Sequence, residues 1–161
     1  MARMNVKGLE NFSQMIVAMG ERGGDVMKAA VYEGADVMTR ALKEAIMELP
    51  EEEGYLPNGA KRQVITKQEK QAMADHVGIA SMDYTGGKVT TAIGFNGYTG
   101  HPTKKYPKGT PVALLARSIE SGSSVRHKFP FIRTVGKTAK EKVQQAMIEA
   151  ANQKIQELTK E

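Results

Sequence analysis

The 161-residue sequence contains no cysteine and no tryptophan, and aromatic residues make up only 6% of it. Without cysteine, the chain has no disulfide, no thiolate zinc site and no cysteine nucleophile. Scarce aromatic side chains leave few surfaces on which nucleic-acid bases could stack. No apolar run approaches the roughly 20 residues of a membrane span, and "MARMNVKGLENF" lacks the apolar core of a signal peptide. These absences favour a protein that stays in the cytosol unless it joins a larger particle.

The residue patterns of enzyme active sites are also missing. Val135-Gly136-Lys137-Thr138 resembles the end of a phosphate-binding loop, but the first glycine of that motif would fall at Phe131. His76, His101 and His127 lie far apart in the sequence, and none has a second ligand at metal-binding spacing. We therefore expect no catalytic, cofactor-binding or metal-binding residues, and a protein that is not an enzyme and has no small-molecule substrate.

Positive charge is concentrated in the C-terminal part of the chain. Residues 1–100 carry 11 Lys/Arg against 13 Asp/Glu, whereas residues 101–161 carry 12 against 5. A basic segment can contact nucleic acid or an acidic protein, or can simply form a solvated face. A nucleic-acid-binding module is therefore one alternative, although the sequence contains no recognised reader motif. Its contacts would come from Lys104, Lys105, Lys108, Arg126, Lys128 and Arg133.

Apolar spacing predicts helices towards both ends of the chain. A short amphipathic segment covers residues 8–21, and after "RGG" at 22–24 a longer helix runs to about residue 49, where Pro50 ends it. Its predicted apolar face contains Met27, Val31, Ala35, Met38, Leu42, Ala45 and Leu49. The last helix is expected to begin near "VGKT", with Thr138 as a candidate cap. Its predicted apolar face contains Ala139, Val143, Met147, Ala150, Ile155 and Leu158.

The middle of the chain mixes strands, loops and short helices. Thr66 and Glu69 have capping-box spacing, which predicts a short helix through about residue 75. Two alternating runs, at 76–84 and 88–95, are joined by "TGGK" and predict an antiparallel hairpin. Residues 97–111 form a basic loop that we expect to be mobile and to order on contact with a neighbour. Thr110-Pro111 then begins a helix that Gly122 ends, with Val112, Leu115, Ala116 and Ile119 on its apolar face.

These elements predict an α+β fold, in which an antiparallel sheet that includes a hairpin packs against a long N-terminal helix and a C-terminal helix. The length suits a single domain covering residues 1–161. Within it, residues 50–76 form a loop and short-helix insert, and residues 97–111 form the mobile basic loop.

One segment, "PVALLARSIESGSSVRHKFPFIRTV", is similar to a pattern in the tail-completion and head–tail joining (neck) proteins of long-tailed bacteriophages. In that family an apolar helical turn ends in Glu and Gly, small hydroxyl residues and a basic loop follow, and Pro-Phe-aliphatic-Arg precedes the final helix. The matching residues here are Ala116, Arg117, Glu120, Gly122, Ser123, Ser124, Pro130, Phe131, Ile132 and Arg133. The order of the upstream segments "GLENF", "VGIAS" and "VTTAIGF" also matches, although the insert at 50–76 is longer than in compact members.

The resemblance implies a non-catalytic virion protein of a phage or prophage, made in the bacterial host cytoplasm. Its partners would be copies of itself in a ring and neighbouring head-connector or tail proteins, with at most weak nucleic-acid contact. The interface or loop-anchor candidates are Arg117, Glu120, Gly122, Ser123, Phe129, Pro130, Phe131, Ile132 and Arg133. We expect Phe131 or Ile132 to anchor the final helix to the sheet and Glu120 to form an ion pair with Arg133.

Overall fold

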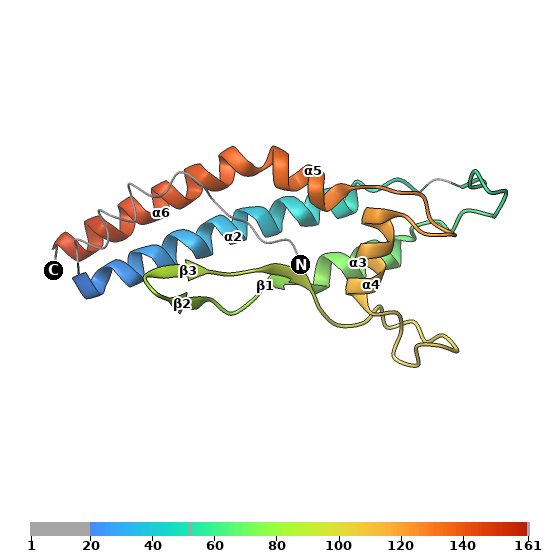
Figure 1. Cartoon of the computed structure of the whole chain (residues 1–161), viewed down its shortest axis with the longest axis horizontal. Coiled ribbons are helices and arrows are strands. Elements are labelled where there is room, and N and C mark those ends of the chain that lie inside the picture. The colour runs from blue at the N-terminus through green and yellow to red at the C-terminus, as the bar shows by residue number, and fades with distance from the viewer. Residues whose placement is uncertain (1–19, 52, 161) are drawn as a thin grey trace. The chain divides into compact units, whose positions relative to one another are not determined.

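The computed structural model describes residues 20–51 and 53–160, which form five α-helices and two short antiparallel strand pairs (Figure 1). The elements are η1 (Gly20–Arg22), α2 (Gly23–Met47), α3 (Lys67–His76), β1 (Val77–Ile79), β2 (Asp83–Thr85), β3 (Lys88–Thr90), β4 (Ile93–Phe95), α4 (Val112–Ser121), α5 (Phe131–Thr138) and α6 (Lys140–Lys160). The predicted α+β class is confirmed. Residues 8–19 of the predicted N-terminal segment lie outside the described residues. None of the helices in the described part is long and apolar enough to cross a membrane.

The described residues form two compact units. The first contains residues 20–39, 79–93 and 138–160, and the second contains residues 40–51, 53–78 and 94–137. Helix α2 therefore contributes its N-terminal part to the first unit and its C-terminal part to the second. The hairpin β2–β3 and α6 belong to the first unit, whereas α3, α4, α5 and the loop 97–111 belong to the second.

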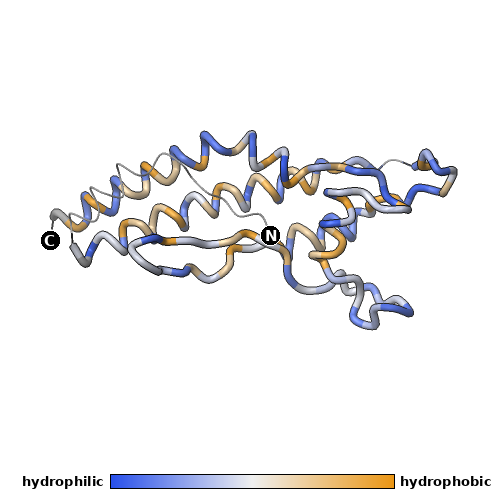
Figure 2. Tube along the Cα trace, viewed as in Figure 1, coloured by the Kyte–Doolittle hydropathy of each residue, from blue (hydrophilic) through white to orange (hydrophobic). Residues whose placement is uncertain are grey.

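In the first unit, α2 and α6 lie side by side, as Figure 1 shows. Their backbones approach closely at Gly34, where an added Cβ would lie 2.5 Å from Met147 Cγ and 3.3 Å from Val143 Cγ1. Segments coloured as hydrophobic recur along both helices in Figure 2. The buried apolar side chains of this unit are Val26, Ala30, Ala35, Met38, Ile93, Ala139, Val143, Met147 and Ala151.

The predicted apolar faces are only partly right. In α2 the buried side chains begin with Val26 and Ala30, so the predicted Met27 and Val31 are only half-buried. Towards the end of α2, Ile46 is buried in place of Ala45, and in α6 Ala151 replaces Ala150. Each of these errors is a shift of one residue, or about 100° around a helix, because an apolar residue flanks the buried one in the sequence. The predicted Ile155 and Leu158 of α6 are also only half-buried. Periodicity alone does not choose between such neighbours.

The predicted hairpin is confirmed. Strand β2 pairs antiparallel with β3, with Asp83 opposite Thr90 and Thr85 opposite Lys88. Gly86 and Gly87 form the turn with φ angles of 61° and 73°, which side chains with a Cβ rarely adopt. The two predicted long strands are each divided, because β1 pairs with β4 and β2 with β3 as separate ladders.

In the second unit, the insert at 50–76 is fixed by polar contacts as well as by apolar packing. The predicted capping box is present: Glu69 N–H donates to Thr66 Oγ1 (3.2 Å), and Thr66 N–H donates to Glu69 Oε2 (3.0 Å). Lys70, only 6% exposed, pairs with Glu51 (3.0 Å) and donates to the Met47 carbonyl at the C-terminal end of α2 (3.4 Å). A cation there complements the helix dipole. This contact was not predicted from the sequence.

The boundaries of the later helices differ from prediction in two places. The apolar face of α4 is confirmed in full, since Val112, Leu115, Ala116 and Ile119 are all buried. The N-cap position of α4 is occupied by Pro111, however, with no capping hydrogen bond from a side chain, and Thr110 lies one position before it. The "VGKT" stretch, residues 135–138, forms the last turn of α5 instead of a helix start. Phe131 begins α5, and the carbonyl of the preceding Pro130 accepts the first helical hydrogen bond, from the N–H of Thr134 (3.0 Å).

Candidate functional site

The segment that carries the family resemblance folds as the junction between α4 and α5, residues 117–133. Glu120, near the end of α4, accepts hydrogen bonds from the backbone N–H groups of Ile132 (2.8 Å) and Arg133 (3.2 Å) in the first turn of α5. These N–H groups have no partner within the helix, and a carboxylate also complements the positive end of the helix dipole. Glu120 therefore fixes the direction in which α5 leaves the junction.

The predicted Glu120–Arg133 contact exists, but in a different form. The carboxylate binds the main-chain N–H of Arg133, and the Arg133 side chain is exposed. The prediction of a side-chain ion pair is therefore wrong, because the carboxylate is taken up by main-chain donors at the start of α5. Arg133 remains available on the surface.

A tight reversal of the chain makes this capping contact reachable. Gly122 ends α4 with φ of 77°, and a Cβ there would lie 3.2 Å from Lys128 Cβ. The N–H of Phe129 donates to the Ile119 carbonyl (2.8 Å), which closes the loop. Phe131 is 6% exposed and packs edge-on against Phe95 of β4, with ring centroids 6.4 Å apart. Phe131 thus anchors α5 to a strand, whereas the prediction was that Phe131 or Ile132 would anchor the final helix, which is α6.

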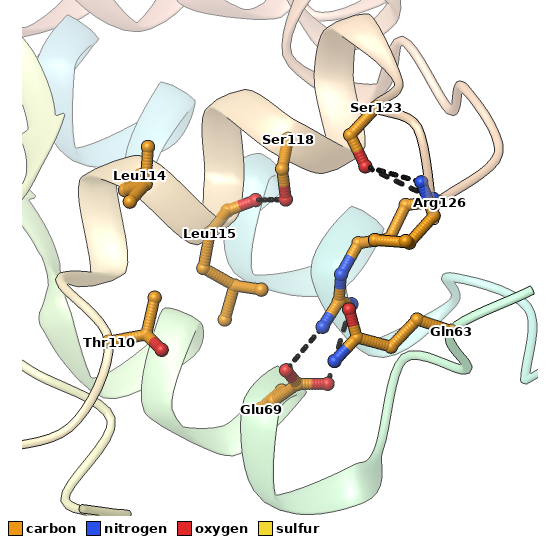
Figure 3. A pocket seen from close by; sticks show the side chains of 9 residues that line it. Gln63, Glu69, Thr110, Leu114, Leu115, Ser118, Ser123 and Arg126 are labelled. Carbon is orange, nitrogen blue, oxygen red and sulfur yellow. Dashed lines mark hydrogen bonds and ion pairs between the residues drawn. The ribbon is translucent and has the colours of Figure 1, made fainter. Parts of the chain in front are cut away.

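Within the loop, Ser123 and Arg126 form a second fixed point. Ser123 Oγ accepts from the N–H of Arg126 (3.0 Å), and the N–H of Ser123 donates to the Arg126 carbonyl (3.0 Å). The guanidinium of Arg126 then reaches Glu69 in α3, with Nη2 2.6 Å from Oε1 and Nη1 3.5 Å from Oε2 (Figure 3). The Arg126 side chain is 7% exposed and that of Glu69 is 19% exposed. The pair is a buried link between the junction and α3.

This pair was not foreseen from the sequence. Glu69 was predicted only as a helix-capping residue, and Arg126 was grouped with exposed cations that could contact phosphate. Its burial removes Arg126 from that group. The two residues are 57 positions apart, and nothing in the local sequence of either one signals the other.

A pocket of about 200 Å³ lies beside the pair. Its lining residues are Gln63, Glu69, Thr110, Leu114, Leu115, Ser118, Ser123, Val125 and Arg126, most of which Figure 3 labels. Leu114 and Val125 are 43% and 42% exposed, respectively. Ser118 Oγ donates to the Leu115 carbonyl (2.7 Å), and the charges of Glu69 and Arg126 neutralise each other. The pocket thus combines exposed apolar surface from Leu114 and Val125 with polar groups of Ser118, Ser123, Glu69 and Arg126 that are bonded within the protein.

The remaining predicted residues lie at the surface of the same unit. Arg117, Ser123, Pro130 and Arg133 are exposed; Glu120, Gly122, Phe129 and Ile132 are half-buried. Lys104, Lys105 and Lys108 are exposed on the loop that precedes α4. In the part of the chain that the structure describes, no three His, Asp or Glu side chains are grouped so as to hold a metal ion. Compared with protein-family models, curated proteins and solved structures, the sequence gives no match.

Proposed function

We propose that this chain is a structural protein of a phage or prophage virion, and that it acts in tail completion or head–tail joining through ring-forming protein–protein contacts. The observation that carries the proposal is the sequence pattern from Arg117 to Arg133, because it resembles the neck-protein pattern and folds as one fixed junction. Glu120, Gly122 and Phe131 each have a distinct structural task in that junction. Their order in the sequence thus has a physical basis.

A fixed junction suits an assembly protein because exposed side chains are then presented in a constant geometry. Binding to a preorganised surface avoids the entropic cost of ordering it. Arg117, Pro130 and Arg133 are exposed around the junction, and Leu114 and Val125 add exposed apolar surface nearby. Exposed apolar groups beside arginines are typical of protein interfaces. These side chains are our candidates for contacts with a neighbouring subunit or connector protein.

The charge distribution supports contacts between unlike surfaces. Residues of the first unit, including its termini, carry nine Lys/Arg and ten Asp/Glu, and those of the second carry 14 and eight. The excess of positive charge in residues 101–161 lies wholly in residues 101–137, since residues 138–161 carry four Lys/Arg and four Asp/Glu. A ring requires two different complementary patches on each subunit. An acidic surface would complement the basic second unit.

Deletion of the gene from its phage or prophage tests the function. Lysates of the deletion strain and of a complemented control would be compared by electron microscopy. We expect DNA-filled heads and unattached tails in the deletion strain and whole virions in the control. Intact virions in normal number from the deletion strain would reject the proposal.

A further inference from the structure

The second unit contains a group of exposed positive charges for which the described residues show no ion pair. Residues 94–137 include eight Lys/Arg and a single acidic residue, Glu120. Glu120 is engaged by the backbone of α5, and Arg126 is buried against Glu69. The other seven cations are all exposed. Three of them, Lys104, Lys105 and Lys108, lie in a single five-residue stretch of the loop 97–111.

The base of this loop is closed by hydrogen bonds between its two arms. Tyr98 and Pro111 form an antiparallel bridge. Thr99 N–H donates to the Thr110 carbonyl (3.0 Å), and Thr110 N–H donates to Thr99 Oγ1 (3.1 Å). Gly109 is buried with φ of 94°, and a Cβ there would lie 2.7 Å from the backbone nitrogen of Gly100 across the loop. The arms therefore pack backbone against backbone.

The tip is closed as well. Tyr106 N–H donates to the Thr103 carbonyl (3.1 Å), and Thr103 N–H donates to the Tyr106 carbonyl (2.9 Å). Lys104 and Lys105 are the two residues between them, at the end of a small hydrogen-bonded turn. Lys105 Nζ lies 5.6 Å from the centre of the Tyr106 ring, which supports its stem. The lysines thus lie on a protruding loop whose base and tip are both closed by hydrogen bonds. The loop is visible beyond α4 in Figure 1.

We propose that the tip of this loop binds the phosphate backbone of double-stranded DNA. Phosphates accept hydrogen bonds from lysine ammonium groups, which act as compact point charges. From residue 97 to residue 110 the loop has no aliphatic side chain, as its blue and white trace in Figure 2 reflects. Protein interfaces, in contrast, are depleted in lysine and depend on apolar and aromatic anchors. The composition of the tip therefore favours a nucleic acid over an acidic protein.

The same composition indicates contact with the backbone and not with the bases. The loop contains no Arg, Asn or Gln, the side chains that most often read base edges. Lys105 lies over one face of the half-buried Tyr106 ring, so that face is not open for stacking on a base. Tyr98 is 49% exposed but lies at the base of the loop, in the bridge to Pro111, and not at the tip. Binding should therefore be independent of sequence and steeply dependent on salt. This inference goes beyond the proposed joining function, which requires only protein contacts.

The test measures binding of the purified full-length chain to a fluorescein-labelled DNA duplex of about 20 base pairs by anisotropy, over about 20–200 mM KCl. The variant K104Q/K105Q/K108Q removes the three tip charges. The control, K88Q/K140Q/K142Q, removes three exposed lysines of the first unit. We expect the tip variant to lower the slope of log K against log[KCl] by about 2 to 3 and to weaken binding more than about tenfold at 0.1 M KCl. The control should change affinity less than about threefold.

A second variant tests whether the close packing of the two arms of the loop matters for binding. Gly109→Ala keeps every charge but places a Cβ against the opposite arm, so we expect weaker binding with a nearly unchanged salt slope. Equal affinities for the tip variant and the control would overturn the proposal, as would no binding of the unmodified chain at 20 mM KCl. Displacement of the DNA by poly-glutamate at equal charge concentration would assign the tip to an acidic protein instead. None of these outcomes bears on whether heads and tails join.

Discussion

Replacing Arg126 by methionine isolates the contribution of the buried Arg126–Glu69 pair. Methionine keeps most of the apolar stem but leaves the Glu69 carboxylate without its guanidinium partner. Removing one member of a buried ion pair typically costs about 3–5 kcal/mol. Here Glu69 Oε2 retains the Thr66 N–H (3.0 Å), while Oε1 loses the 2.6 Å contact with Arg126 Nη2. With one oxygen still bonded, we expect a loss near the lower limit, about 3 kcal/mol of unfolding free energy.

The assay is urea denaturation followed by far-ultraviolet circular dichroism, with the double-mutant cycle of Arg126→Met and Glu69→Gln. Because Glu69→Gln leaves an amide that can still bond Thr66, the second substitution should recover part of the loss caused by the first. We expect a coupling energy above about 1.5 kcal/mol, as for contacting buried residues. A loss below about 1 kcal/mol with no coupling would match an exposed pair and would refute the reasoning.

The other predictions concern stability and use the same denaturation assay. Gly122→Ala should destabilise the protein by about 1–2 kcal/mol, since φ of Gly122 is 77°. Gly136→Ala, within α5 and in open space, should instead stabilise it by up to about 1 kcal/mol. Equal effects of the two substitutions would contradict the positive φ assigned to Gly122. Glu120→Gln should cost about 1 kcal/mol by weakening the cap of α5, and an unchanged midpoint would exclude a capping role. Gly34→Ala should cost about 1–3 kcal/mol because its Cβ would meet Met147; a neutral result would mean that α2 and α6 pack less closely than described.

Elements governed by local signals were predictable from the sequence. The apolar face of α4 needs only the spacing of Val112, Leu115, Ala116 and Ile119, and its end needs only the glycine that follows. The capping box of α3 depends on residues three apart, and the hairpin turn depends on two adjacent glycines. In these cases the atoms that stabilise the element belong to a few consecutive residues, so a short window contains the physical cause.

Contacts between distant segments were not predictable. The Lys70–Glu51 and Arg126–Glu69 pairs depend on how α3 packs, and the surrounding letters are those of ordinary charged surface residues. Glu120 does contact Arg133 as expected, but the donor is the main-chain N–H of Arg133, and the side-chain identities in a sequence do not indicate main-chain contacts. Sequence patterns thus indicated where the junction lies and left open how it is fixed.

The most direct test of the account is complementation of the gene deletion with surface variants of the junction. R117E/R133E reverses two exposed arginines there, and K140E/K142E reverses two exposed lysines on α6 as the matched control. Circular dichroism would first establish that both proteins keep the helical signal of the parent. We then count whole virions, separate heads and separate tails in electron micrographs. We expect the α6 control to restore whole virions and the junction variant to yield DNA-filled heads with unattached tails. Full restoration by the junction variant would contradict the claim that this surface joins the virion.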